Sequence, residues 1–188
     1  MVGGKTRQVK VTAVDPHMAS WYGPEVIFLL KLKINYVVLL QNLHSDVREA
    51  HADQILQFAR NAGNRDNSDV VIIAGDLNSS PNTPAYNRFS DYTDAFVDYF
   101  SDSSEESTEH ATWGRPGNTW SGPSSQNYDG HTVRIDYVFY NLRRKNNVKS
   151  IKTLAYHTVD LKTRGVRGEE VSLSDHSWVK ARLRMNFE

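Results

Sequence analysis

Residues 70–81 read VVIIAGDLNSSP, and the rest of the predicted fold follows from them. Five apolar residues without polar alternation predict a strand that is buried on both faces and ends at Gly75-Asp76. Loops just beyond the ends of buried strands commonly carry reactive groups. Asp76 and Asn78, at i and i+2, can point the same way and reach one ligand. The alternative is an Asx-turn in which both side chains bond only to the local backbone.

The composition restricts the class of protein. The chain has 188 residues, enough for one domain with a sizeable core. Lys+Arg and Asp+Glu are each 22, so the formal net charge is zero. This balance weighs against nucleic-acid binding by bulk electrostatics, because such proteins are usually basic. There are no cysteines, which excludes disulfides and thiolate metal sites.

Neither the N-terminus nor the interior resembles a membrane or export signal. Residues 1–10, MVGGKTRQVK, have no apolar core. The longest apolar region, 26–40, is interrupted by Lys31, Lys33 and Asn35 and is shorter than the ~20 residues of a bilayer span. We therefore expect a cytoplasmic or peripheral membrane location.

The first half of the chain predicts a strand–helix–strand crossover unit. Residues 8–14 suit an edge strand, and 25–32 and 34–43 suit buried strands. A helix should begin at Ser45 or Asp46 and stop at Gly63. Its expected buried face is Val47, Ala50, Ile55, Phe58 and Ala59.

The second half predicts further elements in order. We expect a short helix over 81–89 that starts at Asn82 or Thr83, and a helical turn within 92–100. The Ser/Glu/Asp run 101–109 should be a solvated loop, and 112–130, rich in Gly, Pro, Ser and Trp, an ordered loop. Three strands, 133–140, 148–156 and 178–185, should close the domain.

Four short polar groups lie at the ends of predicted strands: 42–44, 76–78, 134–137 and 174–176. Asp136, inside a strand of Val, Ile and Tyr, needs a partner, and we expect it to orient His176 as a general base. Asp76 can position a water, and Asn78 and His44 can donate to an oxyanion. Carboxylates suit Mg²⁺, which prefers oxygen ligands. This inventory favours phosphodiester hydrolysis by an activated water.

Each group also has a purely structural interpretation. Asp136 can pair with Arg134, which shares its face of the strand. His44 can be a helix-capping or core histidine, and Asp175-His176 can be a simple turn before the last strand.

The motifs GDLNSSP, TW, RIDYVFY and LSDH, in this order, resemble the endonuclease/exonuclease/phosphatase superfamily. Within it, the chain is most similar to animal neutral sphingomyelinases. That likeness rests on NLHSDVREAHADQILQF, DVVIIAGDLNSSPNTPAY and SLSDHSWVKARLRM, and it runs from about residue 20 to the C-terminus.

The resemblance implies an α+β fold, the C-terminal part of a four-layer α/β/β/α (DNase I-like) sandwich, with residues 1–188 as a single partial domain. It makes His176 the general base and Asp136 its orienting acid. Asp76 and Asn78 would hold the water and the phosphate. His44 would stabilise the phosphate oxygens, and Asp175 would lie near or on the metal. The implied reaction cleaves sphingomyelin to ceramide and phosphocholine with Mg²⁺, on phospholipid at a membrane surface.

The chain departs from the family pattern near its beginning. The superfamily starts with a strand carrying an Asn and a later strand ending in a metal-binding Glu. The only Glu before His44 is Glu25, which is too close to His44 for that role. We therefore expect the N-terminal portion to be missing, Mg²⁺ binding to be weak or absent, and activity to be impaired. We also expect self-association through an exposed sheet face.

Three functions remain open from the sequence. The first is a sphingomyelinase-type phosphodiesterase. The second is an AP endonuclease or DNase-like nuclease, which neutral charge and the lack of a basic stripe make less favoured. The third is a truncated, non-catalytic binding fragment. Trp113, Trp120 and Tyr128 can contact choline through cation–π attraction of about 0.5–2 kcal/mol, or they can simply pin the loop.

Overall fold

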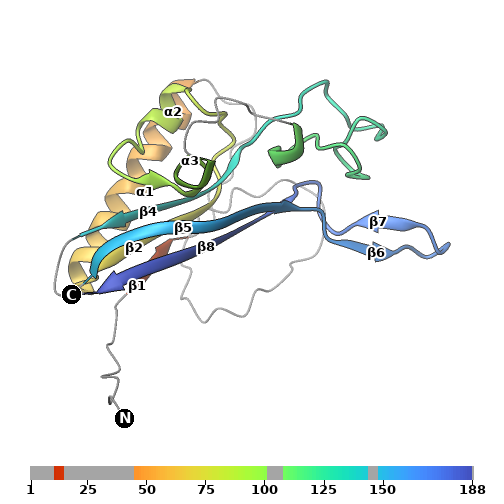
Figure 1. The fold of residues 1–188 in the computed structure, drawn as a ribbon. Coiled ribbons are helices and arrows are strands. Elements are labelled where there is room, and N and C mark those ends of the chain that lie inside the picture. The colour runs from red at the N-terminus through yellow and green to blue at the C-terminus, as the bar shows by residue number, and fades with distance from the viewer. Residues whose placement is uncertain (1–10, 15–44, 101–107, 144–147, 188) are drawn as a thin grey trace, which may run out of the picture.

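The computed structural model describes residues 11–14, 45–100, 108–143 and 148–187. The strands expected at 25–32 and 34–43, most of the loop 101–109, and His44 lie outside the described residues. Figure 1 shows three layers: helices α1 and α2, a central sheet, and a long ribbon of β5 and β8 on its other face. This arrangement is α+β and matches three layers of the expected four-layer, DNase I-like sandwich.

The central sheet has the strand order β1-β2-β4-β3. Its strands are β1 (Val11–Val14), β2 (Val70–Asp76), β3 (Thr93–Asp94) and β4 (Asp136–Leu142). β1 runs parallel to β2, and β4 runs antiparallel to β2 along its whole length. The last residue of β2, Asp76, lies directly opposite the first residue of β4, Asp136. The strand expected from the apolar run 70–74 is confirmed and ends at Asp76.

Alternation along these strands supplies both faces of the sheet with apolar side chains. One face packs under the helices α1 (Ser45–Arg65) and α2 (Pro84–Asn87). Val71 and Ile73 of β2 and Tyr137 and Phe139 of β4 lie on this side. The opposite face, which includes Ile72 and Tyr140, packs against the second sheet and α3 (Ala95–Phe100). The sheet is thus buried on both sides, as a continuous apolar run predicts.

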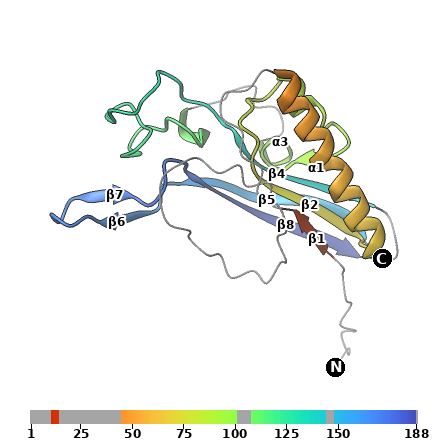
Figure 2. The same cartoon turned by 180° about the vertical axis from the view of Figure 1, so that it is seen from behind.

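The second sheet pairs β5 (Val148–Val159) with β8 (Trp178–Phe187) in antiparallel register. Inward-facing side chains reach the core, and three positively charged residues of β8 alternate with them and are exposed: Lys180, Arg182 and Arg184. Beyond this ribbon, β6 (Lys162–Arg164) and β7 (Glu170–Ser172) form a hairpin that projects from the body of the domain (Figure 2). The sequence analysis did not anticipate this hairpin.

Helix α1 begins at Ser45, as expected, but its buried face and its end differ from the prediction. The buried residues are small or on a neighbouring stripe: Ala52, Leu56, Ala59, Ala62 and Gly63. Phe58 is 45% exposed, and Gly63 lies inside the helix. A Cβ at Gly63 would come within 2.8 Å of Cγ2 of Val71. Glycine here permits close helix–sheet approach. Of the expected buried face, Ala59 is buried and Ile55 packs partly against the core, whereas Ala50 and Phe58 are exposed.

The other expected elements agree with the structure. Thr83 caps α2 with Pro84 in its first turn, and α3 lies within the segment expected to turn. Trp113 in the loop 112–130 forms an isolated bridge with Val133, and the strand expected from 133 begins at Asp136. A one-turn 3₁₀ helix, Thr108–His110, precedes this loop. None of the helices in the described part of the chain combines the length and the apolar composition that a membrane crossing needs.

A buried ion pair ties the end of β3 to the segment just before β4. Nη1 of Arg134 lies 2.8 Å from Oδ2 of Asp94, and both side chains are almost fully buried. Asp94 also accepts hydrogen bonds from the hydroxyl of Tyr86 and the amide of Phe96. The guanidinium lies 4.3 Å from the ring centroid of Phe96, a cation–π contact. Arg134 therefore pairs with Asp94 and leaves Asp136 for another partner.

The substitution Asp94→Asn should destabilise the domain by about 3–5 kcal/mol, because it leaves the Arg134 charge buried without its partner. Urea unfolding monitored by circular dichroism measures this. Asp91→Asn is the matched control, since Asp91 forms an exposed pair with Arg60 and its loss should cost about 0–1 kcal/mol. Equal effects of the two substitutions would contradict the prediction.

Candidate active site

Two carboxylates meet at one edge of the central sheet. Asp76 ends β2 and Asp136 begins β4, and antiparallel pairing places the two residues opposite each other. Asp76 is 5% exposed, so its carboxylate has left most of the solvent. Like charges this close require a proton, a cation or a basic group nearby.

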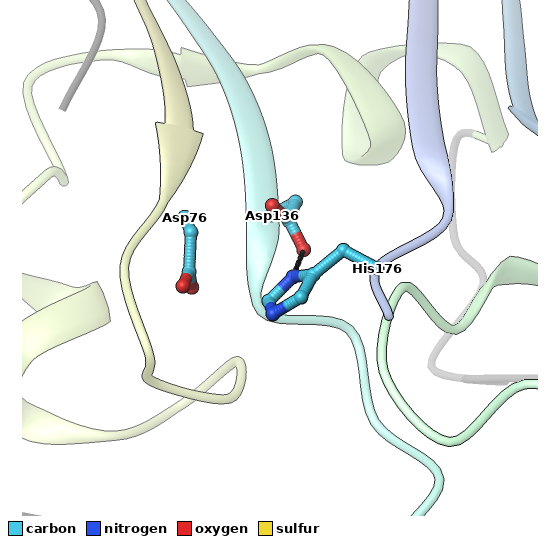
Figure 3. A group of neighbouring side chains, drawn as sticks. All are labelled: Asp76, Asp136 and His176. Carbon is cyan, nitrogen blue, oxygen red and sulfur yellow. Dashed lines mark hydrogen bonds and ion pairs between the residues drawn. The ribbon is translucent and has the colours of Figure 1, made fainter. Parts of the chain in front are cut away.

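His176 supplies that basic group from the second sheet. It lies in the segment between β7 and β8, and its Nδ1 is 2.8 Å from Oδ2 of Asp136. Figure 3 shows the ring between Asp136 and the space beside Asp76, with its second nitrogen away from Asp136. The ring of Trp113 packs edge-to-face against His176, with centroids 5.2 Å apart. The structure thus brings three predicted site residues together: Asp76, Asp136 and His176.

The electrostatic environment of this group raises the pKa of both Asp76 and His176. Burial raises the pKa of Asp76, the charge of Asp136 raises it further, and the result is about 7 despite the opposing effect of His176. Burial lowers the pKa of His176, but attraction to Asp136 and a hydrogen bond with it outweigh burial and raise the pKa to about 9. Without a ligand, the imidazole therefore carries a proton at neutral pH.

Asn78 folds back on Asp76. Its backbone amide donates to Oδ1 of Asp76 over 2.6 Å, and its side-chain Nδ2 donates to Oδ2 over 2.8 Å. The backbone adopts φ +46°, which Asn tolerates better than most residues. Arg48 of α1 donates to the carbonyl of Asn78 over 3.2 Å. The Asx-turn alternative describes this local geometry, and it also orients the Asp76 carboxylate.

Asp175 stands apart from this group. The carboxylate of Asp175 accepts from the hydroxyl of Ser174 at 3.3 Å, and its charge raises the pKa of both Asp76 and His176. It is close enough to act electrostatically, but it is not among the clustered side chains that offer metal ligands. His44 lies outside the described residues. The metal role of Asp175 and the oxyanion role of His44 stay predictions.

The donor set can hold a divalent cation. One ligand atom each from Asp76, Asp136 and His176 lie within 4.8 Å of one another. Carboxylate oxygens suit a hard ion such as Mg²⁺. A cation beside Asp76 would also relieve the repulsion from Asp136 that raises the pKa of Asp76. The residues present therefore fit such an ion.

Thr112 is a site residue that sequence reasoning missed. Its hydroxyl, fully buried, accepts from the backbone amides of Ile135 and Asp136 at 3.0 and 3.1 Å. Its carbonyl accepts from the amide of Ser177, next to His176, at 2.7 Å. The motif Thr112-Trp113 was the available signal, but only the folded chain shows that it contacts both halves of the site.

Solved structures share this fold. Truncated TDP2 from Caenorhabditis elegans is 18% identical, with a TM-score of 0.54, and the match covers 100% of this chain and 57% of that one. A mannosyl-6-phosphatase from Bacteroides thetaiotaomicron is 18% identical, with a TM-score of 0.51 and coverage of 76% and 47%. Beta toxin from Staphylococcus aureus is 22% identical, with a TM-score of 0.51 and coverage of 74% and 46%.

The chain spans about half the length of these solved structures, and at this level of identity they show the fold alone. No curated protein matches it. The model of the endonuclease/exonuclease/phosphatase family matches residues 9–176, which include Asp76, Asp136 and His176. The central sheet, helices α1 and α2 and the carboxylate–imidazole group lie within that match, and the chain belongs to the endonuclease/exonuclease/phosphatase family.

Proposed function

We propose that this chain forms the water-activating half of a phosphodiesterase site, in which His176 is the general base. The observation that carries the proposal is the contact of 2.8 Å between Nδ1 of His176 and Asp136, beside the buried carboxylate of Asp76. An imidazole oriented by a carboxylate is the usual arrangement for taking a proton from a nucleophile.

The residues divide the chemistry between them. Asp136 accepts a hydrogen bond from Nδ1–H of His176 and thereby fixes the tautomer. A cation beside the two carboxylates would oppose the charges that raise the pKa of His176, and Nε2 of the neutral imidazole could then take a proton from water. The water oxygen then bonds to phosphorus as the bond to the leaving-group oxygen breaks. The imidazolium so formed is stabilised by Asp136. Asp76, held by Asn78, orients the attacking water. A divalent cation in this group would neutralise phosphate charge.

For the substrate, we propose a phospholipid of the sphingomyelin type at a membrane surface. The support is the sequence resemblance of residues 20–188 to neutral sphingomyelinases, together with Trp113 packed against His176 at the site. An aromatic face at this position suits a quaternary ammonium head group.

A nuclease is the second candidate, and one observation favours it. The chain is neutral overall, but Arg182, Arg184 and Lys180 are exposed on one face of β8, and Lys152 of β5 lies directly opposite Arg184. Like charges that face each other across paired strands destabilise a sheet, so the stability of the fold does not account for this pair. These four exposed cations support the nuclease candidate, which the zero net charge disfavours. They lie on the outward face of the ribbon.

A non-catalytic binding fragment is the third candidate. Titration calorimetry with Mg²⁺ alone separates it from the enzymes. A wild-type chain without binding heat favours the fragment, whereas binding that Asp76→Asn abolishes favours a metal-assisted hydrolase.

The substitution His176→Asn should lower the turnover of a phosphodiester by about 10²–10⁴-fold, because it removes the base that activates water. Parallel assays with Mg²⁺ on sphingomyelin in mixed micelles and on abasic duplex DNA measure this and identify the substrate. His157→Asn is the matched control, since His157 is exposed on β5. Unchanged turnover in His176→Asn would refute the proposed role, and cleavage of DNA alone would favour the nuclease.

In the metal-free protein, Asp136→Asn should lower the pKa of His176 from about 9 towards 6.5, because it removes the charge that favours the imidazolium. Since the folded pKa lies above the ordinary value, protonated His176 contributes stability that is complete below about pH 6.5 and is lost as the pH rises through about 9. The variant should lose this dependence.

An NMR titration of the imidazole ring protons, with unfolding measured at several pH values, checks both statements. Asp91→Asn, an exposed carboxylate on the helix side, is the control and should leave the His176 titration unchanged. A His176 pKa that does not move in Asp136→Asn would show that the pair does not control the proton.

A further inference from the structure

The segment 173–177 carries His176 although it has no regular secondary structure. Asp136 comes from the central sheet, whereas His176 lies between the β6–β7 hairpin and β8 of the second sheet. Packing between the sheets does not by itself align a side chain on an irregular segment. Something other than the sheets must hold this segment, and hydrogen bonds from the loop 112–121 do so.

Asn118 is the centre of those bonds. Its side chain is 1% exposed. Nδ2 donates to Oδ1 of Asp160 over 2.9 Å and to the carbonyl of Ser174 over 3.0 Å. Oδ1 accepts from the amides of Trp120 and Ser121 over 2.9 and 3.1 Å. Both donors and both acceptor positions of the amide are thus used, which leaves it one orientation.

These hydrogen bonds hold the segment 173–177 on both sides of His176. Ser174, two residues before it, is bound directly by Asn118. Ser177, the next residue, donates its hydroxyl to the same Oδ1 of Asp160 over 3.0 Å. The hydroxyl of Ser121 adds a bond to the carbonyl of Asp175. Asn118 therefore sets the path of the backbone from which the imidazole projects.

The other end of the loop is attached to Asp136. Thr112 bonds through its hydroxyl to the amide of Asp136 and through its carbonyl to the amide of Ser177. The loop 112–121 is thus a bridge between the two sheets at the site. Thr112 fixes its contact with Asp136, and Asn118 fixes its contact with the His176 segment.

We propose that Asn118 is a positioning residue of this site: it holds the segment around His176 so that Nδ1 stays within hydrogen-bond distance of Asp136. It does not touch the substrate. The expected effect on turnover rests on the proposed hydrolase function, whereas the expected effect on the position of the His176 segment does not.

The first test is Asn118→Ala in the full chain. We expect turnover of the phosphodiester that the wild type cleaves to fall by about 10–100-fold with a nearly unchanged KM, because a small misplacement of the base slows chemistry more than binding. Independently of activity, NMR of the ¹⁵N-labelled imidazole should show loss of the hydrogen-bonded Nδ1–H signal of His176. Leu56→Ala is the control for general destabilisation, since Leu56 is a buried residue of α1, on the far side of the central sheet.

A reciprocal exchange provides the rescue. Asn118→Asp puts a carboxylate against Asp160 and should lose the His176 signal. The double variant Asn118→Asp/Asp160→Asn restores a donor–acceptor pair between the two positions and should recover part of it. This comparison also serves if Asn118→Ala does not fold.

The outcomes are distinct. A folded Asn118→Ala with the wild-type His176 signal overturns the proposal, as does a Leu56→Ala variant that loses the same signal. A double variant no better than Asn118→Asp also counts against it. If the wild type hydrolyses no phosphodiester, the proposed function fails, and the NMR comparison still decides the role of Asn118.

Discussion

The antiparallel pairing of β2 with β4 is the constraint on which the site depends. It sets Asp76 and Asp136 opposite each other at the edge of a sheet that is apolar on both faces. Two carboxylates that have lost much of their solvent cannot both stay charged without compensation. His176 provides part of that compensation. Burial and the charge of Asp136 raise the pKa of Asp76 to about 7 against the effect of His176, and attraction to Asp136 raises the pKa of His176 to about 9 despite its burial. The remaining negative charge makes the group suitable for a cation.

His176 can compensate the charge of the two carboxylates only because the two sheets pack against each other in a fixed position. Tyr140 of the central sheet and Tyr156 of β5 pack with Phe96 of α3 in the core between them. This core fixes the distance between the sheets, while the loop that contains Thr112 and Asn118 fixes the irregular segment around His176. The packed core therefore sets the stability of the domain, whereas the hydrogen-bonded loop at its edge sets the orientation of the His176 side chain.

Charge is distributed unevenly in a chain of zero net charge. Arg134 and Asp94 form a buried pair below the site, and β8 carries an exposed row of three basic residues. Arg134 and Asp136 are two residues apart on one segment, yet each pairs with a different partner. Asp94 lies within reach of the guanidinium under Phe96, whereas His176 approaches Asp136 from the second sheet. Net charge therefore says little about which surfaces of this molecule can meet a polyanion.

The amino-acid sequence alone determined the central strand at 70–76, the order of the later elements, the DNase I-like class and the partnership of His176 with Asp136. The elements and the pair come from local signals: an apolar run, a Pro after a capping Thr, and polar motifs at strand ends. The DNase I-like class was implied by the resemblance of the motifs to a known family. Only the tertiary structure decided which stripe of α1 is buried, that Arg134 pairs with Asp94, that β6 and β7 form a hairpin, and that Asn118 and Thr112 hold the site. Each of those outcomes depends on contacts between segments distant in the chain. A buried amide or a close-packed glycine acquires its partners from the folded neighbours and carries no periodic signal of its own.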